Sequence, residues 1–168
     1  GGMLVIAGPD AALDALEKDL PALPRPPMRL AGHGPFHTPL MQASRDAARA
    51  QFPREWFGQP MIPLIDGRGK VWRRFESRAD ELWDYTFGHQ IVQPYDFTAA
   101  ITVAMREFAA DRVVLLGPGE TLGGAIGQVL VGLKWLDISS RNMFTAVQGE
   151  DPFLISMGRP SQRGIVIP

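Results

Sequence analysis

Two of the chain's three histidines lie four residues apart in the stretch GHGPFHTPLM, residues 32–41. His37 comes just before Pro39, which the first turn of a helix tolerates. Strand-to-helix junctions gather reactive groups in α/β folds, and imidazole titrates close enough to neutrality to serve as a general base. We therefore predict that His37 accepts a proton, and the alternative is a capping or partly buried structural histidine.

The three histidines His33, His37 and His89 could together ligate zinc through neutral imidazoles. However, the first two lie in a segment of glycines and proline rather than on one face of a helix, and no carboxylate is placed to support the imidazoles. The sequence therefore predicts no metal site. His33 is interpreted as a turn residue, and His89 as a helix-end residue favoured by the helix dipole.

The composition sets the class of protein. A chain of 168 residues that is 45% hydrophobic is long enough for one domain with its own core. Its formal net charge of -1, with both signs mixed along the chain, does not favour nucleic acid or an anionic membrane as a partner. The chain has no cysteine and no apolar run long enough to span a bilayer, so we predict a cytoplasmic protein without disulfides or thiol nucleophiles.

Helices and strands alternate in the sequence pattern, which predicts an α/β fold with a largely parallel sheet. Proline and glycine separate the predicted elements. The predicted strands are Met3–Ala7, Met28–Ala31, a hairpin of residues 61–67 with Lys70–Phe75, and Val113–Leu116. The predicted helices follow Pro9, run from His37 to about Gln51, span Ser77–Gly88 and Tyr95–Ala109, and follow the glycine-rich turn at 117–124.

The start of the chain is predicted to be an incomplete unit, and its end to be less regular. An apolar strand at the start cannot bury both its faces and edges within one strand-helix-strand unit, since isolated strand pairs are marginal in water. The chain is therefore interpreted as part of a longer protein. After Lys134 we predict a short strand at WLDIS and then an extension that is packed on the surface or partly mobile.

Four segments between Val5 and Gly124 occur in an order typical of one known family. They are VIAGPDAALDALEKDL with the MRLAGHGPFHTPLM that follows it, MIPLID, QIVQPYDF and VVLLGPGETLGG. In this order the chain resembles the second half of the malonyl-CoA:acyl carrier protein transacylase family. The resemblance implies the latter half of the acyltransferase fold, with an α/β-hydrolase-like large subdomain and part of a ferredoxin-like small subdomain. Residues 1–31 would be the partial small subdomain, 32–134 the C-terminal part of the large one, and 135–168 a C-terminal extension.

The same resemblance implies a function. Members transfer a malonyl group from coenzyme A to acyl carrier protein through a seryl ester, in fatty-acid or polyketide synthesis. It makes His37 the catalytic base, Gln90 the residue that helps to hold and orient it, and Phe36 a substrate-binding residue that shapes the acyl pocket. The implied partners are malonyl-CoA and acyl carrier protein, and no cofactor is expected beyond the coenzyme A thioester itself.

Several motifs of the family do not occur in the chain. They are the G-H-S-x-G elbow with the nucleophilic serine, the P-G-Q-G segment of the oxyanion hole, and the arginine that pairs with the malonyl carboxylate. Leu115 stands where the family commonly has glutamate, and Tyr95 where it has valine. We therefore expect the missing N-terminal part of the same enzyme to be a partner, and the 168 residues alone to be inactive.

Two other functions remain open. Gly117, Gly119 and Gly123 follow a strand and precede a helix, as in a dinucleotide-binding domain, although Glu120 at the helix start would repel phosphate. A tight turn explains the same glycines. The chain could also be a catalytically inactive docking module with an acyltransferase-like fold, whose tryptophans contribute to a binding surface. The tryptophans in question are Trp56, Trp72 and Trp83.

Overall fold

The computed structural model describes residues 3–23, 26–30, 32–117 and 119–167. Helices and short strands alternate along the chain and gather into two units. The first, called here the His37 unit, comprises Val5–Gly67 and Val71–Tyr95. The second, called the C-terminal unit, comprises the described residues of Gly1–Leu4, Arg68–Lys70 and Asp96–Pro168.

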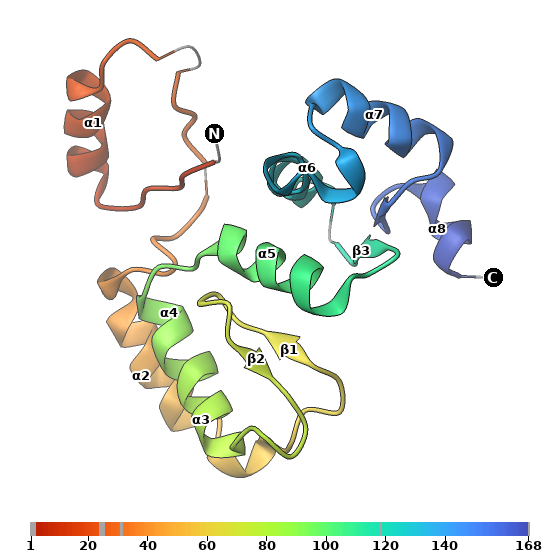
Figure 1. Ribbon diagram of the computed structural model, residues 1–168. Coiled ribbons are helices and arrows are strands. Elements are labelled where there is room, and N and C mark those ends of the chain that lie inside the picture. The colour runs from red at the N-terminus through yellow and green to blue at the C-terminus, as the bar shows by residue number, and fades with distance from the viewer. Residues whose placement is uncertain (1–2, 24–25, 31, 118, 168) are drawn as a thin grey trace. The chain divides into compact units, whose positions relative to one another are not determined.

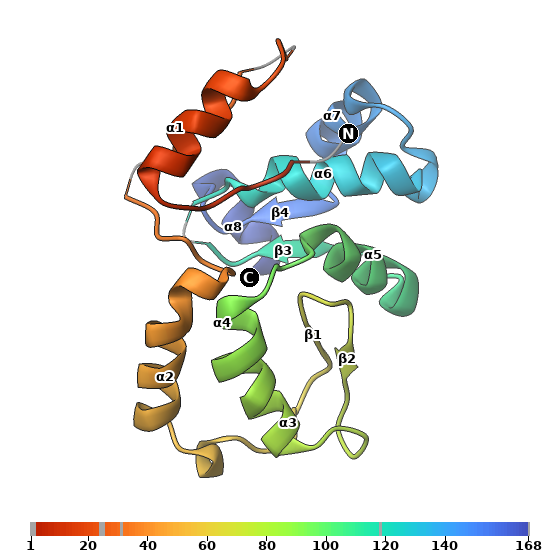
Figure 2. The same ribbon diagram turned by 90° about the vertical axis from the view of Figure 1, so that its left-hand side faces the viewer.

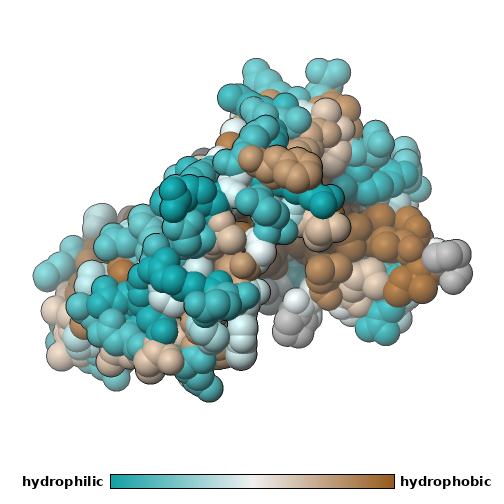
Figure 3. All heavy atoms as spheres, turned by 90° about the horizontal axis from the view of Figure 1, so that it is seen from below, coloured by the Kyte–Doolittle hydropathy of each residue, from teal (hydrophilic) through white to brown (hydrophobic). Residues whose placement is uncertain are grey.

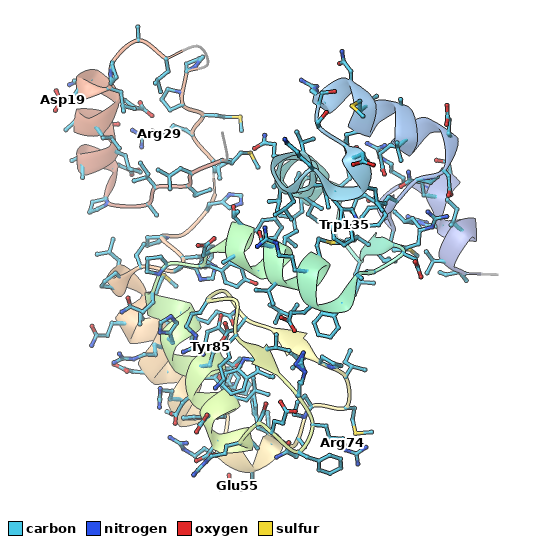
Figure 4. All side chains as sticks on the ribbon, viewed as in Figure 1. Asp19, Arg29, Glu55, Arg74, Tyr85 and Trp135 are labelled. Carbon is cyan, nitrogen blue, oxygen red and sulfur yellow. The ribbon has the colours of Figure 1, made fainter. Side chains whose placement is uncertain are left out.

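The first helix, α1 (Asp10–Asp19), is joined to the segment that follows it by one arginine. Arg29 donates from Nε to Glu17 and from Nη2 to Asp14, both at 2.6 Å. Figure 4 shows its side chain between the two segments. None of the side chains of α1 is buried, and such exposed ion pairs contribute little stability. The predicted helix is confirmed, but it has almost no core beneath it.

The two strands predicted around α1 are wrong. Residues 3–9 and 26–30 contain no strand, while Ala31 lies outside the described residues. Val5 is 74% exposed and Met28 is 80% exposed. A strand is stable only when its backbone pairs with a neighbour and its apolar side chains pack on a core. The described residues supply neither for these two segments.

The remainder of the His37 unit is a helical pair with a small hairpin (Figure 1). Leu64 pairs with Trp72 in the antiparallel hairpin, and the predicted hairpin is confirmed. The helix predicted after residue 77 is also confirmed, with a π-helical segment in its middle. The elements are η1 (Pro39–Met41), α2 (Gln42–Gln51), η2 (Arg54–Trp56), β1 (Leu64–Ile65), β2 (Val71–Trp72), α3 (Ala79–Asp84), the π-helical η3 (Tyr85–His89) and α4 (Gln90–Val92).

Three buried side chains form the core of this unit. Trp72 is 1% exposed and packs with Leu82 and Tyr85. Trp72 Nε1 donates to the carboxylate of Asp66 at 3.2 Å, and Asp66 itself is buried. Figure 4 shows Tyr85 between the long helix and the hairpin. The hairpin is therefore anchored to the helix by aromatic packing.

A charged cluster packs around Trp83 of the same helix. The guanidinium carbons of Arg49 and Arg54 lie 4.5 Å and 4.2 Å from the centroid of its ring. Both arginines also donate to the carboxylate of Asp84, Arg54 at 2.8 Å and 3.1 Å. The hydrogen bond from Arg54, followed by the positive charges of both arginines, lowers the pKa of Asp84. This carboxylate therefore pairs with two cations that lie over one indole ring.

We expect Asp84→Asn to destabilise the protein at neutral pH by about 1 kcal/mol or less, because the 44% exposed carboxylate is partly screened by solvent. Asp84 has a lower pKa in the folded state than in the unfolded state. Its contribution is therefore complete above the unfolded-state pKa and is lost as the pH falls through the folded-state pKa. Urea unfolding at several pH values measures this difference, and exposed Asp19→Asn is the control. A difference that stays constant down to strong acid would contradict the prediction.

The C-terminal unit is built on a parallel strand pair covered by helices (Figure 2). β3 (Val113–Leu115) lies beside β4 (Leu154–Ser156), with Val113 opposite Leu154. The outer edge of β4 is closed by two glutamine side chains: Gln148 bonds both the N–H and C=O of Leu154, and Gln162 accepts from the N–H of Ser156. The helices are α5 (Phe97–Phe108), α6 (Leu122–Leu133), the 3₁₀ turn η4 (Trp135–Asp137), α7 (Arg141–Glu150) and α8 (Pro160–Val166).

The core of this unit corrects the prediction for the chain after Lys134. The expected surface extension is wrong for Phe153 and for β4, all of which are buried. Phe153 and Leu154 belong to one core cluster with Met105 and Leu130. The expected strand at WLDIS is also wrong, since η4 is a 3₁₀ turn in which Leu136 has a positive φ. The predicted strand at 113, the helix Phe97–Phe108 and the helix after the glycine-rich turn are confirmed.

The fold class is thus mixed α/β. The predicted single, largely parallel sheet is wrong for the described residues, which form one antiparallel and one parallel pair of strands. Within the described stretches no helix is both long and apolar enough to cross a bilayer. Figure 3 shows one face of the molecule, where apolar side chains reach the surface among hydrophilic ones.

Candidate active site around His37

The loop that carries His37 is fixed by the residue after it. Thr38 precedes η1, and its hydroxyl donates to the carbonyl of Pro35 at 2.7 Å and accepts from the N–H of Leu40 at 3.3 Å. Pro39 is the first residue of that 3₁₀ turn, which is a position where its missing N–H costs nothing. The prediction that Pro39 begins a helical segment leading to Gln51 is confirmed.

His37 has a φ of 60°, in the left-handed region that side chains with a Cβ rarely adopt. Such a conformation costs of the order of 1–3 kcal/mol and persists only where the surroundings enforce it. Strained residues of this kind concentrate at functional sites. Five other non-glycine residues among those described also have a positive φ, so the backbone conformation supports His37 as a candidate without singling it out.

The His37 imidazole is held by one backbone carbonyl. Its Nδ1 lies 2.6 Å from the carbonyl oxygen of Gln90. A carbonyl oxygen can only accept, so Nδ1 must carry the proton. In the neutral imidazole this leaves Nε2 with a free lone pair, which is the state a general base needs.

The carbonyl of Gln90 is available because of Pro94. In an α-helix the carbonyl of residue 90 would accept from the N–H of residue 94, but proline has none. Proline also disfavours helical geometry in the residue before it, and Gln93 is extended with φ -121° and ψ 152°. The helix therefore ends at Val92 and leaves an acceptor free for His37. This spacing is a sequence signal for the acceptor that our sequence analysis missed.

The structure brings Gln90 to His37, and the main-chain carbonyl of Gln90 accepts the hydrogen bond from the imidazole. The predicted part of the Gln90 side chain in orienting His37 stays a prediction. Phe36 is 56% exposed beside His37, with its ring over Gly34, where an added Cβ would lie 3.3 Å from the ring. Its predicted part in an acyl pocket stays a prediction.

One further aromatic side chain contacts the imidazole. The ring of Tyr95 lies 5.4 Å from that of His37, centroid to centroid, with 44° between the planes. Burial, and then the negative charge of Asp66, raise the pKa of Tyr95, so its hydroxyl stays neutral at physiological pH. The sequence analysis noted Tyr95 only as a departure from the family pattern.

The other candidate sites fare differently. The ring of His89 stacks on Tyr85 at 5.7 Å with 25° between the planes. Across the described ranges, no three or more histidine, cysteine, aspartate or glutamate side chains are grouped so as to hold a metal ion. Trp72 and Trp83 are core residues, whereas Trp56 is 69% exposed.

The glycine-rich turn has a structural explanation. Gly117 and Gly119 have φ of 99° and 74°, which glycine adopts without strain. The carboxylate of Glu120 pairs with Arg159. A Cβ at Gly158 would lie 2.5 Å from the carbonyl oxygen of Gly119, so the turn packs closely on the segment after β4. The glycines at 117, 119 and 158 therefore have backbone and packing reasons within the turn itself.

The backbone conformation of His37 gives a test of the site in solution. Ala at a φ of 60° is strained and Gly is not, so His37→Gly should be more stable than His37→Ala by about 1 kcal/mol. Both variants lack the imidazole, so their difference isolates the backbone. The same comparison at Ala47, exposed inside α2, should have the opposite sign, with glycine costing about 1 kcal/mol. Urea unfolding of the four proteins measures both, and an alanine variant as stable as His37→Gly would contradict the prediction.

Comparison with known proteins identifies no relative of this chain. The chain matches no family model, and neither the curated proteins nor the solved structures contain a match.

Proposed function

We propose that the chain is the part of a malonyl-CoA:acyl carrier protein transacylase that carries the catalytic base. In this proposal His37 Nε2 takes the hydroxyl proton of a serine while the serine oxygen attacks the thioester carbonyl of malonyl-CoA. The carbon–sulfur bond then breaks, and coenzyme A leaves as a thiol with the proton returned by His37. The phosphopantetheine thiol of acyl carrier protein next attacks the seryl ester, with His37 accepting the thiol proton and passing it to the serine oxygen.

The observation that carries the proposal is the 2.6 Å hydrogen bond between His37 Nδ1 and the carbonyl of Gln90. The two residues are 53 positions apart in the sequence. The resemblance makes His37 the base through one motif and Gln90 the residue that orients it through another. The bond fixes the tautomer that a general base requires, as the third member of a catalytic triad does. The strained backbone of His37 is a second support.

In this proposal the nucleophilic serine comes from another part of the same polypeptide. The 168 residues contain no G-H-S-x-G motif. The chain would then be the latter half of the acyltransferase fold, and the exposed segments 3–9 and 26–30 would become strands of the small subdomain when the remaining strands are present. A cytoplasmic location, and a place in fatty-acid or polyketide synthesis, belong to the same proposal.

The test is intact-mass spectrometry of the polypeptide encoded by the complete gene, incubated with malonyl-CoA and then with acyl carrier protein. We expect one malonyl group to be added to the polypeptide and then moved to the carrier. The 168 residues alone should not turn over. Turnover by them that His37→Ala abolishes would contradict the need for a serine from elsewhere.

A docking module is the second candidate, because Trp56 is 69% exposed. Phe75 is 84% exposed at a φ of 70°, so a second large aromatic side chain of the His37 unit also faces solvent. Aromatic residues of this kind are enriched in protein interfaces. If neither malonyl-CoA nor another acyl-CoA donor labels the complete polypeptide, the transacylase proposal fails and the docking module becomes the better explanation.

A further inference from the structure

The ring of Tyr95 is placed against the imidazole of His37 by Pro94 and by the extended Gln93 before it. Both rings belong to the His37 unit, and their centroids are 5.4 Å apart. The tilt of 44° is an ordinary arrangement for two packed aromatic rings. Nδ1 of His37 is already committed to the carbonyl of Gln90, so the tyrosine ring limits rotation of the imidazole without competing for that hydrogen bond.

Gly67 makes room for the tyrosine ring. A Cβ at residue 67 would lie 2.3 Å from Cδ2, 2.6 Å from Cγ and 2.7 Å from Cε2 of Tyr95. Gly67 has no left-handed φ, so its backbone conformation does not require glycine. The approach of the Tyr95 ring is therefore the physical reason for a glycine at this position.

Gly67 is itself held in place. Its N–H donates to the hydroxyl of Tyr85 at 2.7 Å, and Tyr85 is a buried core residue of η3. A continuous set of contacts thus runs from Tyr85 through Gly67 and Tyr95 to His37. The imidazole is bounded by a ring packed on a fixed backbone and by the carbonyl of Gln90.

We propose that Tyr95 is a positioning residue for His37, whose ring, packed on Gly67, keeps the imidazole oriented with Nδ1 toward the carbonyl of Gln90 and Nε2 free. Its importance for acyl transfer rests on the proposed function, whereas its effect on the imidazole does not. The aromatic ring of Tyr95, rather than its hydroxyl, orients the imidazole. Tyr95→Phe should therefore preserve the arrangement, and Tyr95→Ala should release it.

The tautomer of His37 gives a direct readout. Long-range proton–nitrogen NMR distinguishes the Nδ1–H from the Nε2–H form of the imidazole. The spectra are recorded on the full 168-residue chain at a pH well above the ordinary titration range of imidazole. His37→Ala assigns the signal among three histidines. We expect a single Nδ1–H tautomer in the wild type and in Tyr95→Phe, and a mixture of both tautomers in Tyr95→Ala.

Two more variants complete the design. Gly67→Ala keeps the tyrosine but displaces its ring, so it should give the same mixture as Tyr95→Ala. Phe36→Ala removes an exposed ring next to His37 in the sequence and should leave the tautomer unchanged. Loss of the single tautomer in Tyr95→Phe, or its retention in Tyr95→Ala or Gly67→Ala, would overturn the proposal. Tyr95→Phe preserves the packed volume, so the proposal remains falsifiable even if Tyr95→Ala and Gly67→Ala do not fold.

The complete polypeptide separates this proposal from the proposed function. In malonyl transfer, Tyr95→Ala should lower kcat by about 10- to 100-fold with KM changed less than about threefold, and Tyr95→Phe should keep kcat within about threefold. If the wild-type polypeptide transfers no malonyl group but Tyr95→Ala changes the tautomer of His37, the transacylase is rejected and the positioning role is retained. Transfer with an unchanged tautomer in Tyr95→Ala would reject the positioning role alone.

Discussion

His37→Ala is expected to lower malonyl transfer by the complete polypeptide by about 10²- to 10⁴-fold, whereas Gln90→Ala should cost less than about tenfold. The larger loss is the usual contribution of a positioned general base. The smaller loss follows because alanine at position 90 keeps the backbone carbonyl that accepts from Nδ1. The measurement is the rate at which the malonyl group appears on the carrier at saturating malonyl-CoA.

Gln90→Ala is the matched comparison for His37→Ala, since the two residues share one hydrogen bond, in which Gln90 takes part through its main-chain carbonyl. A loss as large in Gln90→Ala would mean that the glutamine side chain acts directly, contrary to the geometry. Full activity in His37→Ala would place the base elsewhere. Unfolding curves of both variants show whether a loss of activity reflects a loss of the folded state.

Leu130→Ala is expected to destabilise the C-terminal unit by about 3 kcal/mol. Leu130 is fully buried among Met105, Ile126 and Phe153, and removing its side chain leaves a cavity in a packed core. Leu122→Ala, in the same helix but 52% exposed, is the control and should change stability by less than about 0.5 kcal/mol. Urea unfolding followed by far-ultraviolet circular dichroism measures the stability of both variants against the wild type. Similar losses of unfolding free energy in the two variants would contradict the assignment of Leu130 to the core.

The helices as far as Leu133 could be predicted because their apolar residues recur at helical spacing and their ends are marked by proline or polar caps. Asp96, for example, caps α5 by accepting from the N–H of Ala99. The sequence analysis missed α7 and α8, which lie in the stretch after Lys134. The strand β4 could not be predicted, since three residues carry no alternation and their partner β3 lies about forty residues earlier. Met3–Ala7 misled for the opposite reason: an apolar run has strand character, but only a paired neighbour makes it a strand.

The sequence predicted two of the residues that the structure brings together, but not the contact between them. The sequence pointed to His37 and Gln90, and the structure places them in contact. It did not reveal that a main-chain carbonyl makes the contact, although Pro94 contained that information. The packing of Tyr95 on His37 and Gly67 depends on ring positions in three dimensions, which no periodicity encodes.

The pairing of β3 with β4 also sets an order for folding during synthesis. Every paired element of the His37 unit, including the contact between His37 and Gln90, is complete once residue 95 has left the ribosome. The C-terminal unit cannot close its sheet until residues 154–156 have been made. Until then α6 exposes apolar side chains that later face β4, so this half of the chain depends longer on protection from aggregation.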